Sequence, residues 1–129
     1  MSASKARGTA WESAIVTYLR GRGASYAERR ALNGGSDRGD IAGVPGVVVE
    51  AKAEARVDLA GWLAEAERER ANDGAAIGAA WAKRRGKASP ADGYVVMTGA
   101  TFVALLIEAG YIPQDPGQGH VPMIEGVGQ

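Results

Sequence analysis

Apolar positions near the N-terminus recur at helical spacing. Between Trp11 and Leu19 they follow an i, i+4, i+7, i+8 pattern, which predicts a helix over residues 9–20. Thr9 and Glu12 have the T-x-x-E spacing of a capping box, in which each side chain bonds the backbone N–H of the other residue. We therefore expect this helix to begin at Thr9.

A second amphipathic stripe follows Asp58, a residue type that caps helices. Its apolar members are spaced i, i+3, i+4, i+7 and are Leu59, Trp62, Leu63 and Ala66. The charged residues between 65 and 70, Glu69 included, are expected mostly on the solvent side. Asn72-Asp73-Gly74 ends this helix, and residues 100–109 predict a third helix that Gly110 closes.

Five shorter segments predict strands. Residues 25–32 alternate weakly, and a loop over residues 33–39 separates them from a hairpin made of residues 40–44 and 47–52 around Pro45-Gly46. Residues 75–82 and 94–97 are apolar runs of strand length. The order helix, three strands, helix, two strands, helix predicts an α/β fold with a central mixed five-stranded sheet flanked by helices.

Composition and charge narrow the function classes. The chain has 129 residues, no Cys and one His, which excludes cysteine chemistry and histidine-rich metal cages. Its net charge is zero, but residues 1–30 carry six Lys/Arg against two Asp/Glu, and residues 83–87 hold four more basic side chains. Segregated charge of this kind allows a basic surface to face a polyanion while acidic residues face elsewhere.

We expect a single domain over residues 1–110 and a tail rich in proline and glycine over residues 111–129. The sequence has no apolar run of membrane-spanning length and no signal peptide at its N-terminus, so we expect no membrane partner. The expected location is the cytoplasm of a bacterium or of a phage-infected host cell.

The polar residues of the hairpin carry the candidate chemistry. Glu50 and Lys52 lie on one face of the second strand because side chains alternate along a strand. A three-residue loop places position 40 directly opposite position 50, whereas a two-residue turn shifts the pairing by one. In either register Asp40 and Glu50 lie close together and favour a hard divalent cation such as Mg²⁺ between them. Lys52 could then orient or deprotonate an attacking water, or neutralise charge on a phosphate.

Simpler interpretations of these residues stay open at this point. Lys52 and Glu50 could form a solvated charge pair at the end of a sheet. Glu12 could serve only the capping box, and Ser36 could serve only a turn. The basic residues at 29–30 and 83–87 could be a solvated strand edge and a solvated loop.

Taken together, the ordered motifs resemble those of the PD-(D/E)XK nuclease superfamily, and within it the archaeal-type Holliday junction resolvases. The matching pieces are Glu12, Arg29-Arg30, Gly34-Gly35-Ser36, Asp40-Ile41-Ala42 and Val48-Val49-Glu50-Ala51-Lys52. The departure is Gly39, which stands where the family usually has proline. The resemblance implies a restriction-endonuclease-like core.

The resemblance also implies roles for individual residues. Asp40 and Glu50 would bind Mg²⁺, or Mn²⁺ in its place, with the Ala51 carbonyl and Glu12 contributing. Lys52 would be catalytic, and Ser36 would lie in a catalytic loop. We expect the basic residues to bind DNA; they are Arg7, Arg29, Arg30, Arg38, Lys83, Arg84, Arg85 and Lys87.

The function expected from this reasoning is a Mg²⁺-dependent DNA endonuclease that cuts four-way junctions. A homodimer is expected because a junction needs two incisions that a two-fold pair of active sites supplies. The alternatives are another endonuclease of the superfamily, of restriction, nicking or repair type, and a DNA-binding domain without catalysis.

Overall fold

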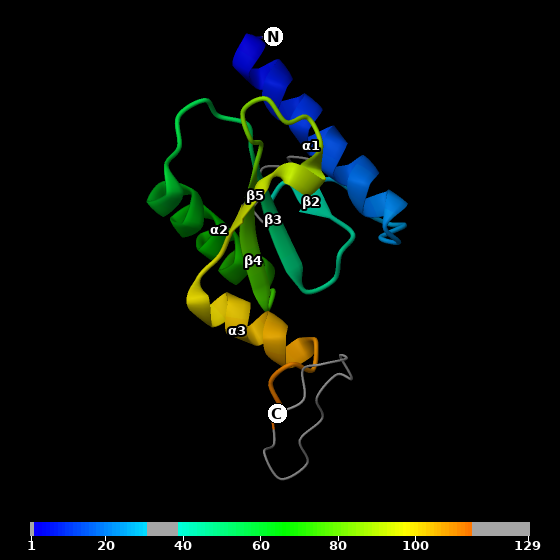
Figure 1. The fold of residues 1–129 in the computed structure, drawn as a ribbon, viewed down its shortest axis with the longest axis vertical. Coiled ribbons are helices and arrows are strands. Elements are labelled where there is room, and N and C mark those ends of the chain that lie inside the picture. The colour runs from blue at the N-terminus through cyan, green and yellow to red at the C-terminus, as the bar shows by residue number, and fades with distance from the viewer. Residues whose placement is uncertain (1, 31–38, 115–129) are drawn as a thin grey trace. The chain divides into compact units, whose positions relative to one another are not determined.

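The computed structural model describes residues 2–30 and 39–114, and its backbone forms two compact units, residues 1–97 and 98–129. The first unit holds a five-stranded mixed sheet and two long helices, and Figure 1 shows its elements. The α/β class and the central five-stranded sheet with flanking helices are confirmed. The boundary expected at residue 110 stays a prediction.

Helix α1 (Ala3–Gly21) begins six residues before the expected start at Thr9. Its N-cap is Ser2, whose hydroxyl accepts the backbone N–H of Lys5 at 3.1 Å. The predicted capping box is therefore wrong, because Thr9 lies inside the helix. The buried side chains of α1 are Trp11, Ile15 and Val16, so the predicted stripe is the packed face.

The sheet has the order β1-β2-β3-β4-β5. Its strands are β1 (Glu28–Arg29), β2 (Ile41–Ala42), β3 (Val47–Lys52), β4 (Ile77–Ala82) and β5 (Tyr94–Val96). Strands β3 and β4 are parallel and the other neighbours are antiparallel. Of the strand expected over residues 25–32, the described residues 25–30 form strand at Glu28 and Arg29, and residues 31 and 32 lie outside the described part of the chain.

Helix α2 (Leu59–Asp73) makes the crossover from β3 to its parallel neighbour β4. Asp58 caps it as predicted, and Gly74, in the left-handed conformation with φ 68°, ends it. A 3₁₀ turn, η1 (Pro90–Asp92), precedes β5. Because α1 packs on Val47 and Val49 while α2 contacts Glu50 and Lys52, the two helices cover opposite faces of the sheet.

The core therefore has two layers. On the α1 side, Trp11 is 2% exposed and its indole N–H donates to the Trp81 carbonyl at 2.9 Å. On the α2 side, Trp62 packs with Ala80 and Ala82. Small residues on β4 let α2 approach closely: a Cβ on Gly78 would lie 2.9 Å from the Cβ of Arg70. This close approach carries α2 side chains to the face of β3 that holds Glu50.

The described part of the second unit, residues 98–114, contains helix α3 (Gly99–Glu108). Thr98 caps it and accepts the backbone N–H of Thr101 at 2.9 Å. The expected helix over residues 100–109 is confirmed within one residue at each end. Within α3 only Thr101 is buried, and the remaining side chains are mostly apolar.

No helix within the described residues is both long enough and apolar enough to cross a bilayer.

Candidate functional site

The last residues of β3 place an acid and an ammonium side by side. Glu50 and Lys52 occupy the same face of the strand, and Lys52 Nζ lies 3.5 Å from Glu50 Oε1. Glu50 is only 5% exposed, although a carboxylate is rarely buried without a partner. The strand thus holds an acid and an amine in a largely dry position.

Helix α2 adds two further carboxylates to this face. One oxygen from each of Glu50, Glu65 and Glu69 lies within 4.8 Å of the others. Lys52 Nζ also donates to Glu65 Oε1 at 2.6 Å. Glu69 is fully buried, which contradicts its expected place on the solvent side of the helix. Three acids and one ammonium therefore share a small volume between α2 and β3, a cluster that could hold a metal ion.

Asp40 reaches the same strand from the neighbouring chain segment. Its backbone N–H donates to the Val49 carbonyl at 2.9 Å, and its Oδ2 accepts the Ala51 N–H at 2.8 Å. The pairing of Ile41 with Val49 is the register of the three-residue loop, in which position 40 faces position 50. The structure therefore brings Asp40, Glu50 and Lys52 together.

Burial and neighbouring acids hold the pKa of Glu50 well above its ordinary value. Loss of water is the largest cause, followed by the Glu69 carboxyl, with which Glu50 can share a proton. The charges of Asp40, Glu69 and Glu65 act in the same direction. Two carboxylates this close resist joint ionisation unless a cation lies between them.

The pKa of Lys52 is also raised, which for an amine favours the charged form. Burial lowers its pKa, but the hydrogen bond with Glu65 and the charges of Glu50, Glu65 and Glu54 outweigh burial and raise the pKa above its ordinary value. Lys52 is thus held as an ammonium at neutral pH. An ammonium can stabilise negative charge but cannot accept a proton.

The donor chemistry of the cluster fits a hard divalent cation. Its donor atoms are all carboxylate oxygens, the ligands that Mg²⁺ and Mn²⁺ take. Glu50 Oε2 is buried and accepts no hydrogen bond from a described donor. An ionised oxygen in that position needs a cation, because its desolvation is otherwise uncompensated.

The structure does not bring every predicted site residue to the cluster. Glu12 lies on α1 and forms an ion pair with Arg29 at 2.9 Å, so its partner is a cation of β1. Arg30 lies 4.0 Å from Asp73 at the end of α2. Ser36 and Arg38 are outside the described residues.

The backbone before Asp40 requires glycine at position 39. Its φ is +96°, a conformation closed to proline and strained for any residue with a Cβ. A Cβ at this position would lie 2.8 Å from Val48 Cγ1. Glycine therefore lets the chain run close to β3 and deliver Asp40 to it.

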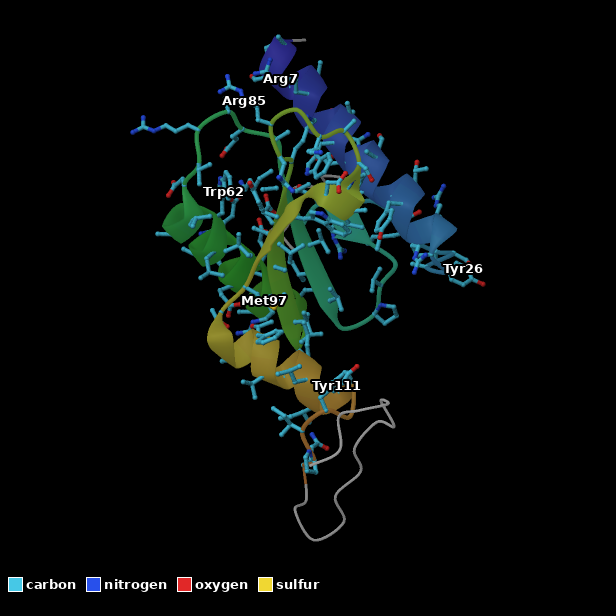
Figure 2. All side chains as sticks on the ribbon, in the orientation of Figure 1. Arg7, Tyr26, Trp62, Arg85, Met97 and Tyr111 are labelled. Atoms are coloured by element: carbon cyan, nitrogen blue, oxygen red, sulfur yellow. The ribbon has the colours of Figure 1, made fainter. Side chains whose placement is uncertain are left out.

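The predicted basic residues after β4 gather with Arg7. Arg7, Lys83, Arg84 and Arg85 line one cavity, which also contacts Glu54 just beyond the end of β3. Figure 2 shows Arg7 and Arg85 at the same end of the first unit. Lys87, in the same loop, is exposed.

Glu65 and Glu69 are the site residues that the sequence pattern did not single out. The signal was present, since Glu69 follows Trp62 by seven residues and Ala66 by three, which places it on the buried stripe. Its charge made solvent the simpler expectation.

Comparisons with family models, with curated proteins and with solved structures found no match to this chain.

Proposed function

We propose that this protein is a Mg²⁺-dependent DNA endonuclease that cuts four-way junctions as a homodimer. The observation that carries the proposal is the pairing of Glu50 with Lys52 at 3.5 Å on β3, with Asp40 bonded to the next backbone N–H. That arrangement agrees with the D-x₉-E-x-K pattern of the PD-(D/E)XK superfamily, which the sequence resembles.

Asp40, Glu50 and the Ala51 carbonyl are the proposed Mg²⁺ ligands. Glu65 and Glu69 lie close enough to Glu50 to add a ligand or to bind a ligating water, a role that we assign to α2 in place of Glu12. Bound Mg²⁺ supplies a water of lowered pKa and neutralises charge on the phosphate, and Mn²⁺ can replace it at oxygen ligands.

Lys52 supplies fixed positive charge. Because its pKa is raised, it acts as an ammonium that stabilises the negative charge developing on a phosphodiester under in-line attack. Glu65 holds this ammonium at 2.6 Å and so positions it beside Glu50. Of the roles open to Lys52, electrostatic stabilisation is the one that its protonation supports.

The basic residues supply DNA contacts. Arg7, Lys83, Arg84 and Arg85 form no ion pair with a described acidic residue, so their charges are available to phosphates. Ala53, the residue that follows Lys52, also lines the cavity that they line. This adjacency supports a role for these cations in holding DNA next to Lys52.

A homodimer suits both the substrate and the surface. Two equivalent active sites related by a two-fold axis cut opposing strands of a junction. Helix α3 carries apolar side chains that are far from buried, with Phe102 54% and Val103 44% exposed. Apolar surface on one helix is typical of an interface between subunits.

The test is cleavage of a fluorescent synthetic four-way junction and of a linear duplex that shares one of its arms, each with Mg²⁺ and with EDTA. We expect paired nicks in the junction with Mg²⁺ and little cutting of the duplex. Asp40→Asn and Lys52→Ala should abolish cleavage and keep junction binding. Equal cutting of both substrates would contradict the junction preference, and no cutting with Mg²⁺ or Mn²⁺ would contradict the enzyme.

A further inference from the structure

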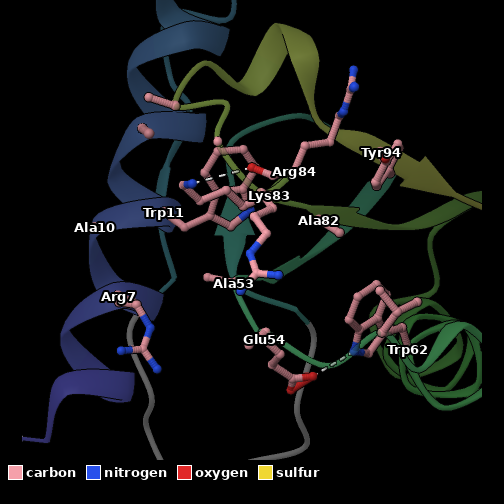
Figure 3. A pocket seen from close by; sticks show the side chains of 16 residues that line it. Arg7, Ala10, Trp11, Ala53, Glu54, Trp62, Ala82, Lys83, Arg84 and Tyr94 are labelled. Carbon is pink, nitrogen blue, oxygen red and sulfur yellow. Dashed lines mark hydrogen bonds between the residues drawn. The ribbon is translucent and has the colours of Figure 1, made fainter.

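A cavity of about 700 Å³ opens at the carboxyl ends of the parallel strands β3 and β4. Figure 3 shows its walls, with α1 contributing Arg7 and Trp11 on one side and α2 contributing Trp62 on the other. The volume lies within the range of pockets that hold small organic ligands. The ends of parallel strands are a common place for such ligands in α/β folds.

The interior of this cavity is apolar and aromatic. Trp11 and Trp62, both almost fully buried, line it together with several alanines, among them Ala53 and Ala82. The phosphates of a DNA backbone do not need a concave apolar surface, because exposed cations are enough to bind them. The apolar and aromatic lining therefore indicates a ligand with a flat apolar part.

The rim of the cavity is cationic. None of its four basic side chains pairs with an acid among the described residues. One of them, Arg84, lies over the ring of Tyr94, 5.2 Å from the ring centroid. A guanidinium held over a tyrosine ring makes a platform on which a base can stack. An entirely apolar ligand would leave these charges without a partner.

One carboxylate faces the same space. Glu54 lies at the cavity wall, and its Oε1 accepts the indole N–H of Trp62 at 2.7 Å, as the dashed line in Figure 3 shows. This bond holds the carboxylate in place while leaving lone pairs for further donors. The exocyclic amino groups of nucleobases are donors of that kind.

We propose that this cavity binds one unpaired DNA nucleotide, with the base in the apolar interior and its phosphates on the arginine and lysine rim. The choice of DNA rests on the proposed function. The site is distinct from the acid cluster but next to it, because Lys52 precedes the cavity residue Ala53 and Glu54 acts on the Lys52 charge. An unpaired nucleotide held there positions the adjoining phosphodiester near Lys52 and favours branched over fully paired DNA.

Binding in EDTA separates this inference from the nuclease activity. The probes are two fluorescent DNA duplexes of equal length, one fully paired and one with a single unpaired 2-aminopurine. We expect the full-length protein to bind the second probe about tenfold more tightly, since one stacked base is worth about that factor. The 2-aminopurine fluorescence should fall on binding as the base becomes stacked.

Matched variants locate the effect. Val57→Glu adds a negative charge at an exposed residue of the cavity wall, and Leu59→Glu adds one at an exposed apolar residue outside it. Only Val57→Glu should remove the preference and the fluorescence change. Arg84→Gln should weaken binding of the unpaired probe, and Arg68→Gln on the exposed side of α2 should not.

Equal affinity of the wild-type protein for the two probes, or equal effects of Val57→Glu and Leu59→Glu, would overturn the proposal. These readouts need no cleavage, so they can succeed when the nuclease assignment fails. A preference for unpaired DNA without Mg²⁺-dependent cutting would support the cavity and contradict the enzyme. Mg²⁺-dependent cutting without a preference for unpaired DNA would support the enzyme and contradict the proposal for the cavity.

Discussion

At the scale of single residues, Glu50 is placed where its own charge is unfavourable. Its side chain is 5% exposed, and it lies near the carboxylates of Asp40, just before β2, and of Glu65 and Glu69 on α2. Such a residue destabilises the metal-free fold, yet it provides the oxygen ligands that a divalent cation needs. Stability lost at this position is consistent with a functional role for the acid.

The first prediction follows from the raised pKa of Glu50. Between its ordinary pKa of 4.5 and the raised value, the folded protein holds a proton that the unfolded chain releases. Stability from this group therefore falls as pH rises. Glu50→Gln removes the cost of protonating this carboxyl on folding, so it should stabilise the metal-free protein at pH 8 by about 1–3 kcal/mol, and by less at pH 5.

Urea unfolding in EDTA at the two pH values measures this difference. Glu28→Gln is the matched control, because Glu28 is exposed on β1 and its removal should change stability little. A Glu50→Gln protein that is less stable than wild type at pH 8 would contradict the electrostatic account of Glu50.

The candidate residues on the hairpin could be predicted because a strand fixes side-chain direction by alternation. Glu50 and Lys52 were expected on one face, and the three-residue loop put position 40 opposite position 50. Glu69 could not be recognised in the same way. Its place on the helical stripe favours burial while its charge favours solvent, and a single sequence does not show that a side-chain hydrogen bond with Glu50 awaits it inside.

At the scale of elements, the site depends on how closely α2 approaches β3. The second prediction is that Glu69→Gln lowers the stabilisation by Mg²⁺ in thermal unfolding, because one of the cluster's charges is lost. A reduction of roughly tenfold in apparent Mg²⁺ affinity is expected.

Glu67→Gln controls for a general effect on α2. Glu67 lies on the same helix but pairs with Arg70 at 3.1 Å, outside the cluster. An unchanged Mg²⁺ response in Glu69→Gln, or an equal loss in Glu67→Gln, would mean that α2 takes no part in the metal site.

The third prediction concerns the segment that delivers Asp40. Gly39→Ala and Gly46→Ala both place a side chain at positive φ, but only the first crowds Val48; Gly46 has open space. Gly39→Ala should therefore destabilise the protein by about 1–3 kcal/mol and by more than Gly46→Ala. Equal losses in urea unfolding would show that crowding at Gly39 is unimportant.

Element types could be predicted from period and turn residues, whereas some bounds could not. The polar residues before Thr9 gave no apolar stripe, so the added turns of α1 and the Ser2 cap were missed. Residues 25–32 have the pattern of a full strand, but among the described residues 25–30 the register with β2 covers Glu28 and Arg29, because strand length depends on the partner strand. Such bounds are set by tertiary pairing rather than by local pattern.

At the scale of the whole molecule, a net charge of zero is the sum of acidic and basic residues that lie in different places. The acids gather between α2 and β3, and four cations gather around the cavity at the carboxyl ends of β3 and β4. The segment charges predicted the separation of acids and bases, but Glu65 and Glu69 of α2, expected on the solvent side, face β3 instead.

The fourth prediction concerns assembly. Phe102→Glu with Val103→Glu places two charges on the exposed apolar side chains of α3, so it should convert the proposed dimer to a monomer in sedimentation equilibrium. Leu59→Glu changes an equally exposed apolar residue on α2 and should leave the dimer intact. A monomeric wild-type protein, or a dimer in the double variant, would exclude α3 as the interface.

The most direct test of the proposed active site is the single-turnover rate of junction cleavage with Mg²⁺ for wild type and Glu50→Gln. Wild type should cut, and the variant should cut at least about a hundredfold more slowly while binding the junction with similar affinity. Cleavage by Glu50→Gln at the wild-type rate would contradict the assignment of the Glu50 cluster as the catalytic metal site.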